Sequence, residues 1–412
     1  NGNVNAFANY THARSGQLGT GSVDTTGLDQ GETVTSDYNT ASAISGGLAW
    51  GGAAAGSKYQ NRTSGINTGL LPAWLGFTGT TRQNDLDVAF TVSMQPNVSD
   101  NGATGDANAP LFRQAFLSFG DKSWGSVKLG KDIGVFASDA ILNDMTLLGV
   151  GAGSAGIYGN AGGSGAATTL GGIGTGYIYA AWKGQVAYTT PNFSGFQATV
   201  AITNPNQQPN AVGNQDRFGL EGKASYEMKQ DGFSGKVWVS GASYDVNLGT
   251  ATYSVSAGDI GARVETGPFS LVGYYYGGKG AGTTFLGANG TATTYTYTAI
   301  ETPAGVDAVA RTANVSTDRR DSDGGYIQLQ YTTPFKTRLG AAYGISNLDL
   351  ASSETAVNNN TVKSNERWTI AAYHPLTKHL NLVAEYNNVQ SEAHDGTKVE
   401  NDTYSAGAIL FF

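Results

Sequence analysis

The feature that most constrains this sequence is a repeated segment of about ten residues in which apolar and polar side chains alternate. In residues 217–228, Glu221 and Lys223 are charged, whereas Leu220 and Tyr226, at positions of the other parity, are apolar. About sixteen such segments follow one another, and their connections alternate strictly between short turns and long polar loops. The period of two predicts β-strands, and the alternating connections predict an antiparallel sheet with an even number of strands.

Composition excludes several other classes of protein. Charged residues make up 14% of the 412 residues, aromatic residues 10%, and 59 residues are Gly, which is wrong both for a disordered chain and for a helical protein. The formal net charge of −8 argues against a nucleic-acid partner, because phosphate binding needs clustered Lys and Arg. No apolar run approaches the roughly 20 residues of a membrane helix. We expect any secretory signal to have been removed, because the chain starts without a charged and then apolar leader.

On several of the long segments one face is consistently polar and the other apolar. This pattern fits a closed barrel with a wet lumen and a lipid exterior, in which no strand has a free edge. We therefore predict an all-β fold with a single domain over residues 1–412, a 16-stranded antiparallel transmembrane β-barrel with long external loops at 15–70 and 278–321. A soluble β-sandwich would also alternate, but it would rarely line its second face with so consistent a polar row.

A long segment rich in Gly, Ala, Ser and Thr interrupts this rhythm between two strands. It covers residues 133–183 and is called the insert below. The insert has no helical or strand period beyond its first turn, and a structureless stretch of this length is usually either functional or disordered. We predict that the insert is a third loop that folds into the lumen and narrows a pore.

Four stretches of the chain resemble the general trimeric porins of Gram-negative bacteria. They are Leu75-Gly-Phe-Thr-Gly79, Arg113-Gln-Ala-Phe116, the run from Gly125 to Val135 with Asp144-Met145 after it, and the last strand, which ends in Phe412. The resemblance implies sixteen antiparallel strands, a homotrimer in the cell outer membrane, and contact with the lipid and lipopolysaccharide of that membrane. It also implies passive diffusion of small hydrophilic solutes and ions through an eyelet, without catalysis or a cofactor.

In that family, carboxylates on the third loop face basic side chains on the opposite wall of the eyelet and set up a transverse field. By position, Asp144 corresponds to the loop carboxylate, Arg113 to a wall arginine and Lys131 to the base at the entrance of the loop. The resemblance therefore implies that Asp144 and Arg113 face each other across the passage.

Three positions depart from the family pattern. Trp74 and Thr189 stand where the family usually has arginines, and Leu148 or a neighbour stands where the loop usually offers a second acid. We therefore expect a weaker field and a more apolar eyelet. The alternative to a general diffusion channel is thus a channel of the same fold that selects a specific organic solute, for which Trp74 would provide a stacking surface.

Three carboxylates, those of Asp132, Asp139 and Asp144, fall at a strand end and in the first part of the insert. If they lie in the pore without partners, they raise the local cation concentration, so we expect a weak cation preference. The competing interpretation is that they are solvated loop carboxylates. The other candidates for the pore wall are Arg82, with Lys183 and Arg217 as weaker ones.

Signals for other chemistry are weak. The histidines, His12, His374, His379 and His394, show no metal-ligand spacing, and no Ser/His/Asp set of a barrel protease or lipase is recognisable. Residues 151–156 match a dinucleotide-binding pattern formally, but the required strand and helix do not flank them. We predict that the protein is not an enzyme and holds no metal. A purely adhesive barrel is a further alternative, and failure to conduct ions would be its first sign.

Overall fold

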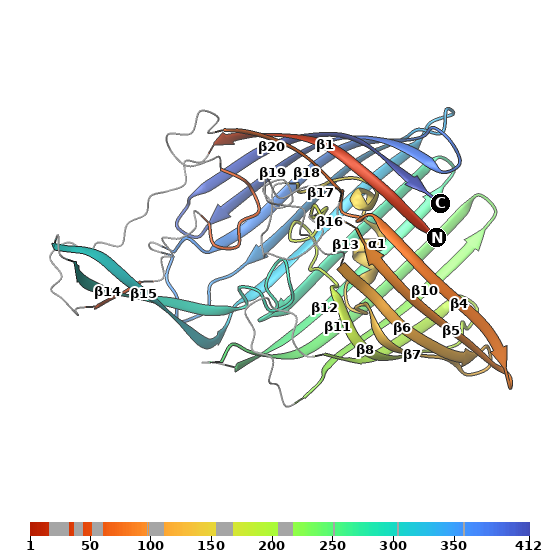
Figure 1. Cartoon of the computed structure of the whole chain (residues 1–412), viewed down its shortest axis with the longest axis horizontal. Helices are drawn as coiled ribbons and strands as arrows, with labels where there is room; N and C mark the ends of the chain where they lie inside the picture. Colours follow the sequence, from red (N-terminus) through yellow and green to blue (C-terminus); the bar gives the residue numbers. More distant parts are fainter. Residues whose placement is uncertain are drawn as a thin grey trace.

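The polypeptide forms a closed β-barrel. The computed structural model describes residues 1–15, 33–36, 44–51, 61–96, 98, 111–153, 168–204, 217–249, 252–302, 305–356 and 359–412. Within them, 17 strands form one antiparallel sheet, and β1 (Gly2–Ser15) closes it by pairing with β20 (Lys398–Phe411). The two chain termini lie side by side at one end of the barrel (Figure 1), where Gly2 and Phe412 exchange backbone hydrogen bonds.

Two of the 17 strands share one place in the wall. Gly2 and Asn3 at the start of β1 pair with β4 (Trp74–Gln83), and residues 7–12 of β1 pair with β3 (Arg62–Asn67). Residues 68–73 separate the two strands, so β3 and β4 together act as one interrupted strand. The barrel is therefore 16-stranded and antiparallel, which confirms the predicted fold class.

The remaining wall strands follow in chain order. They are β5 (Leu86–Gln95), β6 (Leu111–Asp121), β7 (Gly125–Ile133), β8 (Trp182–Thr189), β9 (Phe196–Thr203), β10 (Gly219–Gln230), β11 (Phe233–Asn247), β12 (Thr252–Thr266), β13 (Phe269–Lys279), β16 (Asp321–Thr332), β17 (Arg338–Leu348), β18 (Val362–Pro375) and β19 (Leu380–Ala393). Short turns join them at the end that carries the chain termini, called the short-turn end below, and the longer connections lie at the other end.

The two predicted external loops are only partly loops. Residues 62–67 of the expected loop 15–70 form β3 and belong to the barrel wall, so that boundary is wrong. The Thr and Ser content of this stretch suggested a loop, but Thr also fits a strand once a neighbour such as β1 offers a hydrogen-bonding edge. Residues 16–32, 37–43 and 52–60 of the expected loop lie outside the described residues.

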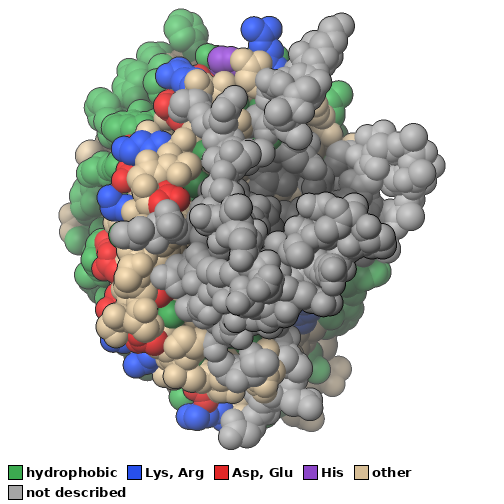
Figure 2. All heavy atoms as spheres, turned by 90° about the vertical axis from the view of Figure 1, so that its left-hand side faces the viewer, with side chains coloured by type: hydrophobic (Ala, Val, Ile, Leu, Met, Phe, Trp, Pro, Cys, Tyr) green, Lys and Arg blue, Asp and Glu red, His purple; other side chains and the backbone are tan. Residues whose placement is uncertain are grey.

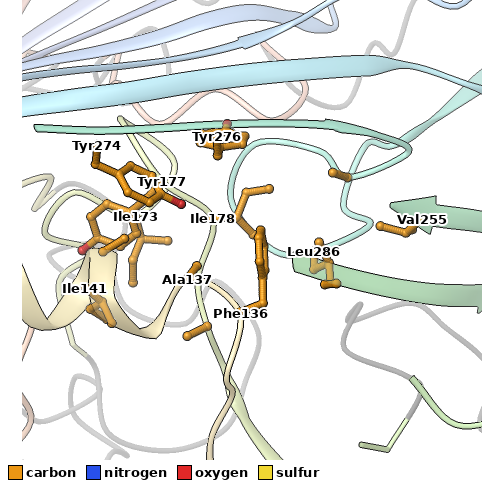
Figure 3. Packing of buried hydrophobic residues seen from close by; sticks show 14 of the residues in the cluster. Phe136, Ala137, Ile141, Ile173, Tyr177, Ile178, Val255, Tyr274, Tyr276 and Leu286 are labelled. Carbon is orange, nitrogen blue, oxygen red and sulfur yellow. The ribbon is translucent and has the colours of Figure 1, made fainter. Parts of the chain in front are cut away.

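The expected loop 278–321 contains a long β-hairpin. Its strands are β14 (Thr291–Thr302) and β15 (Gly305–Arg319), and β14 also pairs with the short β2 (Thr33–Ser36). This small three-stranded sheet projects beyond the barrel at the end away from the termini (Figure 1). Residues before this hairpin lie inside the barrel instead, where Ala281 and Leu286 are buried in one cluster with Phe136 and Ile178 of the insert (Figure 3). The expectation of a wholly external loop over 278–321 is therefore wrong for this part.

The two faces of the wall differ as the sequence period predicts. On β18, Trp368 and Ile370 are exposed, whereas Arg367 and Thr369 are buried inside the barrel. Hydrophobic side chains accordingly lie around the circumference in the end view of Figure 2. None of the described residues belongs to a helix that is long and apolar enough to cross a membrane. The exposed apolar side chains of the strands, such as Trp368 and Ile370, form an apolar belt.

The outward-facing position of Ile370, which is 64% exposed, can be tested by introducing a charge. We expect Ile370→Arg to lower the free energy of unfolding in phospholipid by about 2–4 kcal/mol, because an Arg at the bilayer midplane loses its hydration. Ile370→Leu is the control and should stay close to wild type. The measurement is urea-induced unfolding of the refolded barrel in vesicles, and equal stabilities of the two variants would contradict the assignment of this face to lipid.

Candidate pore constriction

The insert leaves the barrel wall after β7 and returns to it at β8. Its first described part contains a short helix, α1 (Ser138–Asn143), and a 3-10 turn, η1 (Met145–Leu148). α1 starts after Ala137, which has the left-handed φ of 59°, and the Asp144 side chain caps η1 by accepting from the Thr146 amide at 2.9 Å. The insert therefore has local order that its composition did not predict.

A buried glutamate of β10 holds the beginning of the insert. Oε2 of Glu221 accepts hydrogen bonds from the consecutive backbone amides of Val135 at 2.5 Å and Phe136 at 3.0 Å. Its other oxygen, Oε1, accepts from the Lys183 ammonium at 2.5 Å and from the Tyr244 hydroxyl at 2.6 Å. Because the ammonium neutralises the carboxylate, this buried charge is paired and fully hydrogen-bonded.

A second buried glutamate holds the far end of the described first part. Oε2 of Glu385, on β19, accepts from the consecutive amides of Val150 at 2.8 Å and Gly151 at 2.9 Å, and Oε1 accepts from the Tyr373 hydroxyl at 2.6 Å. A Cβ atom on Gly149 would lie 1.8 Å from Oε1 of Glu385, so only glycine allows this close approach. Glu221 and Glu385 are called the two clamps below.

The wall from β10 to β19 runs through β11, β12, β13, β16, β17 and β18, so the clamps are nearly half the circumference apart. Between them, side chains of β16 bind the backbone of the insert. The Tyr326 hydroxyl donates to the carbonyl of Ala140 at 2.8 Å, and the Gln328 amide bonds both the carbonyl of Asn143 and the amide of Met145, at 2.7 and 2.9 Å. All these contacts are made by buried, inward-facing side chains of the wall.

Apolar packing adds to these hydrogen bonds. Figure 3 shows Ile141 of α1 together with Tyr177 of the returning part of the insert and Tyr274 of β13. The ring of Tyr177 meets those of Tyr274 and Tyr326 edge to face, with centroids 6.5 and 5.7 Å apart. The insert is therefore packed against β13 and β16 as a protein core is.

The wall opposite β13 and β16, formed by β4 to β7, does not hold the insert in this way. Among the described residues, no hydrogen bond joins residues 134–181 to β4, β5 or β6. The inner faces of these strands and β7 carry instead a polar row. The Trp74 indole and Ser93 hydroxyl both donate to the Gln114 carbonyl oxygen at 3.1 Å, the Gln114 amide donates to Asp132 at 3.1 Å, and the Lys128 ammonium contacts Asp132 at 2.5 Å.

Asp144 differs from the role implied by the resemblance. Its side chain is only 4% exposed, and besides Thr146 it accepts from the Gly172 amide at 2.9 Å and the Tyr177 hydroxyl at 2.8 Å. Burial, and then the neighbouring Asp144 carboxylate, raise the pKa of Tyr177 well above its ordinary value. No ion pair joins Asp144 to Arg113. Asp144 thus holds the two parts of the insert together, and the structure does not place it beside Arg113.

The other two predicted carboxylates also have partners. Asp139 in α1 forms ion pairs with Lys223 at 3.0 Å and Lys236 at 2.7 Å. Burial alone would raise the pKa of Asp139, but the two ammonium groups outweigh it and hold that pKa below its ordinary value. Asp132 is paired with Lys128. These carboxylates are therefore compensated by cations.

Among the basic candidates, the prediction for Lys131 is wrong. On β7, strand alternation places Lys131 on the same face as Leu129, which is paired with the exposed Leu117 and Val186. The exposed ammonium of Lys131 donates to the carbonyl of Phe112 at 2.9 Å. The inward-facing base on this strand is Lys128, which the parity of the strand would have identified.

The remaining candidates are spread over the barrel. The Arg113 amide donates to the Gln95 side chain at 3.1 Å, and among the described residues no carboxylate forms an ion pair with its guanidinium. Arg82 pairs with Asp87 and Asp121 beside a short turn, Thr189 bonds Thr199 at the same end, Lys183 pairs with Glu221, and Arg217 pairs with Asp245. Arg82 and Thr189 therefore lie at the short-turn end, not beside the described parts of the insert.

A second segment reaches the inner wall near the end with the long connections. In residues 44–51, the Leu48 and Ala49 amides both donate to the Ser391 hydroxyl at 2.9 Å, and the Trp50 amide donates to Asn401 at 2.7 Å. Both acceptors are buried side chains of the wall. This part of the expected loop 15–70 is therefore not simply external.

The clamp at Glu385 can be tested directly. We expect Glu385→Ala to loosen the insert, because the Val150 and Gly151 amides lose their acceptor, at about 1–3 kcal/mol for each unsatisfied group. The readout is single-channel current in a planar bilayer, which should become noisier and larger on average. The control is Glu392→Ala on the same strand, since the ion pairs of Glu392 within the described part of the chain are with Lys363 and Lys398, away from the insert. Identical currents from the two variants would contradict the clamp.

Comparisons with known proteins agree with this architecture. A search of curated proteins finds no match. Among solved structures, the chain is similar to the outer membrane channel DcaP of Acinetobacter baumannii, with 15% identity, a TM-score of 0.63, and coverage of 100% of this chain and 96% of that one. It is also similar to OmpF of Salmonella typhi in a complex with daunomycin, at 13% identity, TM-score 0.56 and coverage of 100% and 97%, and to an anion-selective porin from Comamonas acidovorans, at 13% identity, TM-score 0.54 and coverage of 100% and 99%.

Identities this low show the common fold alone. The family comparison goes further, because the model of the Gram-negative porins matches residues 1–394, which is nearly the whole chain. Together with the closed barrel and its apolar belt, this match identifies an outer-membrane diffusion channel. The chain belongs to the family of Gram-negative porins.

Proposed function

We propose that the insert forms a fixed constriction of this porin and that solutes pass between the insert and the wall formed by β4 to β7. The observation that carries the proposal is the pair of clamps, which hold the insert to inner faces nearly half the circumference apart. The wall of β4 to β6 has no such bonds to the described insert, and its polar row suits hydrated solutes.

The constriction we propose has a weak field. The carboxylates of Asp132 and Asp139 are compensated by lysines, and that of Asp144 is buried in the insert. Leu142, at the end of α1, is 54% exposed, which supports a more apolar eyelet than the family usually has. A weak cation preference remains our prediction, based on the formal net charge of −8, because a negative protein concentrates cations near its mouths.

The test is single-channel conductance of the purified protein in a planar bilayer, with the reversal potential read under a salt gradient. We expect stepwise openings and a reversal potential displaced slightly towards the cation value. Deleting residues 149–176, which include the contact with Glu385, should raise the conductance, because it removes the obstruction. An unchanged conductance would exclude the insert from the pore, and an absence of conductance in the wild type would favour an adhesive barrel.

We also propose a homotrimer. Outward-facing small residues form a patch across three neighbouring strands, in which Ala6 on β1 is paired with Ala408 on β20, and Ala406 is paired with both Ala8 and Ala384. Such a flat patch favours close protein contact, because small side chains let backbones approach, whereas lipid contact favours larger apolar ones. The patch supports the trimer that the family resemblance implies.

The patch predicts the effect of a charged substitution. We expect Ala408→Arg to convert the oligomer largely to monomer on a native gel, because the long charged side chain prevents close contact and is desolvated in the interface. Ile370→Arg, on β18, provides a matched control that adds the same charge outside the patch and should leave the oligomer of the folded fraction intact. A trimer that survives Ala408→Arg would place the interface elsewhere.

A further inference from the structure

A small hollow lies between the insert and the inner wall, on the side facing the short-turn end. It has a volume of about 190 Å³, and its lining includes Leu142, Leu147, Arg263, Gln330, Arg338 and Tyr373. We call it the arginine hollow. Pockets for drug-sized ligands usually measure about 300–1,000 Å³, so the arginine hollow would hold only a small molecule.

The wall side of the hollow carries polar groups without partners. Among the described residues, no hydrogen bond or ion pair involves the side chains of Arg338, Gln330 or Ser270. Elsewhere along the insert, polar side chains of the wall do bind its backbone. The side-chain amide of Gln328, for example, bonds the backbone of Asn143 and Met145. Gln330 as a whole residue is only 8% exposed, and its side chain belongs to the lining of the hollow.

The strand register brings these groups together. Ser270 and Gln330 are directly paired across β13 and β16, and Gln330 is paired with Gly340 on β17. Arg338 is two residues before Gly340 on the same face, which is within reach of a long side chain. The thioether of Met145 covers Gly340, where an added Cβ would lie 2.8 Å from its sulfur. Gln330 and Arg338 both line the hollow, so the amide and the guanidinium can converge on one ligand group there.

Of the two arginines that line the hollow, Arg338 is the one that forms no ion pair among the described residues. Arg263 forms an ion pair with Glu265, which also feels the charge of Arg338 without contacting it. The carboxylate of Asp144 turns towards Thr146, Gly172 and Tyr177 inside the insert, where Arg367 is also close. Arg338 is thus the cation whose planar fork is available, a geometry that suits a carboxylate.

The insert side of the hollow is largely apolar, although Asn143 and Asp144 also belong to its lining. Leu142, Leu147 and Leu148 line it, together with Met145. A bare inorganic ion would gain nothing from these side chains and would lose hydration beside them. A small anion with a hydrocarbon body would bury apolar surface there while its charged group meets the wall.

We propose that the arginine hollow binds a small organic monoanion, with its carboxylate on Arg338 and Gln330 and its hydrocarbon body against Leu142 and Leu147. This inference rests on the proposed function in one respect, which is that solutes must reach the lumen. It adds the class of solute, a small organic monoanion, that would bind briefly near the short-turn end. Because binding does not require conductance, the two proposals can fail separately.

The test is calorimetric titration of the detergent-solubilised full-length protein with benzoate, and with benzamide as the neutral isostere. We expect saturable benzoate binding and at least tenfold weaker binding of benzamide. Arg338→Gln should weaken benzoate binding by about tenfold or more, because it removes a charge-assisted pair of hydrogen bonds. Arg338→Lys should lie between the two, because it keeps the charge but loses the planar fork.

Lys336→Gln is the matched control. Lys336 is exposed in the turn between β16 and β17, two residues from Arg338, and its replacement changes the charge at this mouth equally. It should leave benzoate binding within twofold of wild type. Equal weakening by Lys336→Gln and Arg338→Gln, equal binding of benzoate and benzamide, or no saturable benzoate binding would each overturn the proposal. Conductance in potassium chloride, measured on the same variants, tests the proposed function independently.

Discussion

The arrangement inside this barrel depends on two carboxylates that each accept a pair of consecutive backbone amides. Fixing the backbone of one residue costs about 1–2 kcal/mol in conformational entropy. A Gly-rich insert has no strong helix or strand propensity to offset this cost, so contacts with the wall must hold it. Glu221 and Glu385 supply the missing restraint at places nearly half a circumference apart. Their charges tolerate burial because every oxygen is hydrogen-bonded, and in Glu221 also because Lys183 neutralises it. The packing of Tyr177 and Ile141 follows from where these clamps hold the backbone.

The fold was predictable from the sequence because water and lipid impose opposite demands on the two faces of every strand. On β18, for example, the apolar Ile370 is exposed on the outside, whereas the charged Arg367 is buried inside the barrel. The prediction failed in two stretches that were assigned to loops but form strands. β3 has only six residues and lies in a stretch rich in Gly, Ser and Thr, whereas β14 alternates Thr with Tyr over residues 294–298. Both strands pair with partners distant in sequence, β1 for β3 and β2 for β14. The residues of a strand do not indicate which distant segment it will pair with.

The site was less predictable, for a related reason. Val135 lies 86 residues from Glu221 in the sequence, and Val150 lies 235 residues from Glu385. Nothing near either glutamate in the sequence therefore indicates which backbone amides it binds. Alternation alone would have placed Lys128 inside and Lys131 outside, and on this point the sequence held more information than the family resemblance supplied. Asp144 could be located in the insert but not oriented, because its direction depends on Gly172 and Tyr177 of the returning part.

The pairing of charges within the described interior has a consequence for selectivity. A carboxylate with a lysine beside it, such as Asp139 or Asp132, produces a field that falls off over a few ångströms, so ions passing at a distance experience little of it. Selection among solutes then depends on contact rather than on the long-range potential. Arg338 differs, because its charge has no ion-pair partner among the described residues and it shares the lining of the hollow with leucines of the insert. Such a group acts on an organic anion that touches it and hardly on a hydrated chloride in the passage. A porin of weak ionic selectivity can in this way still distinguish between small organic solutes.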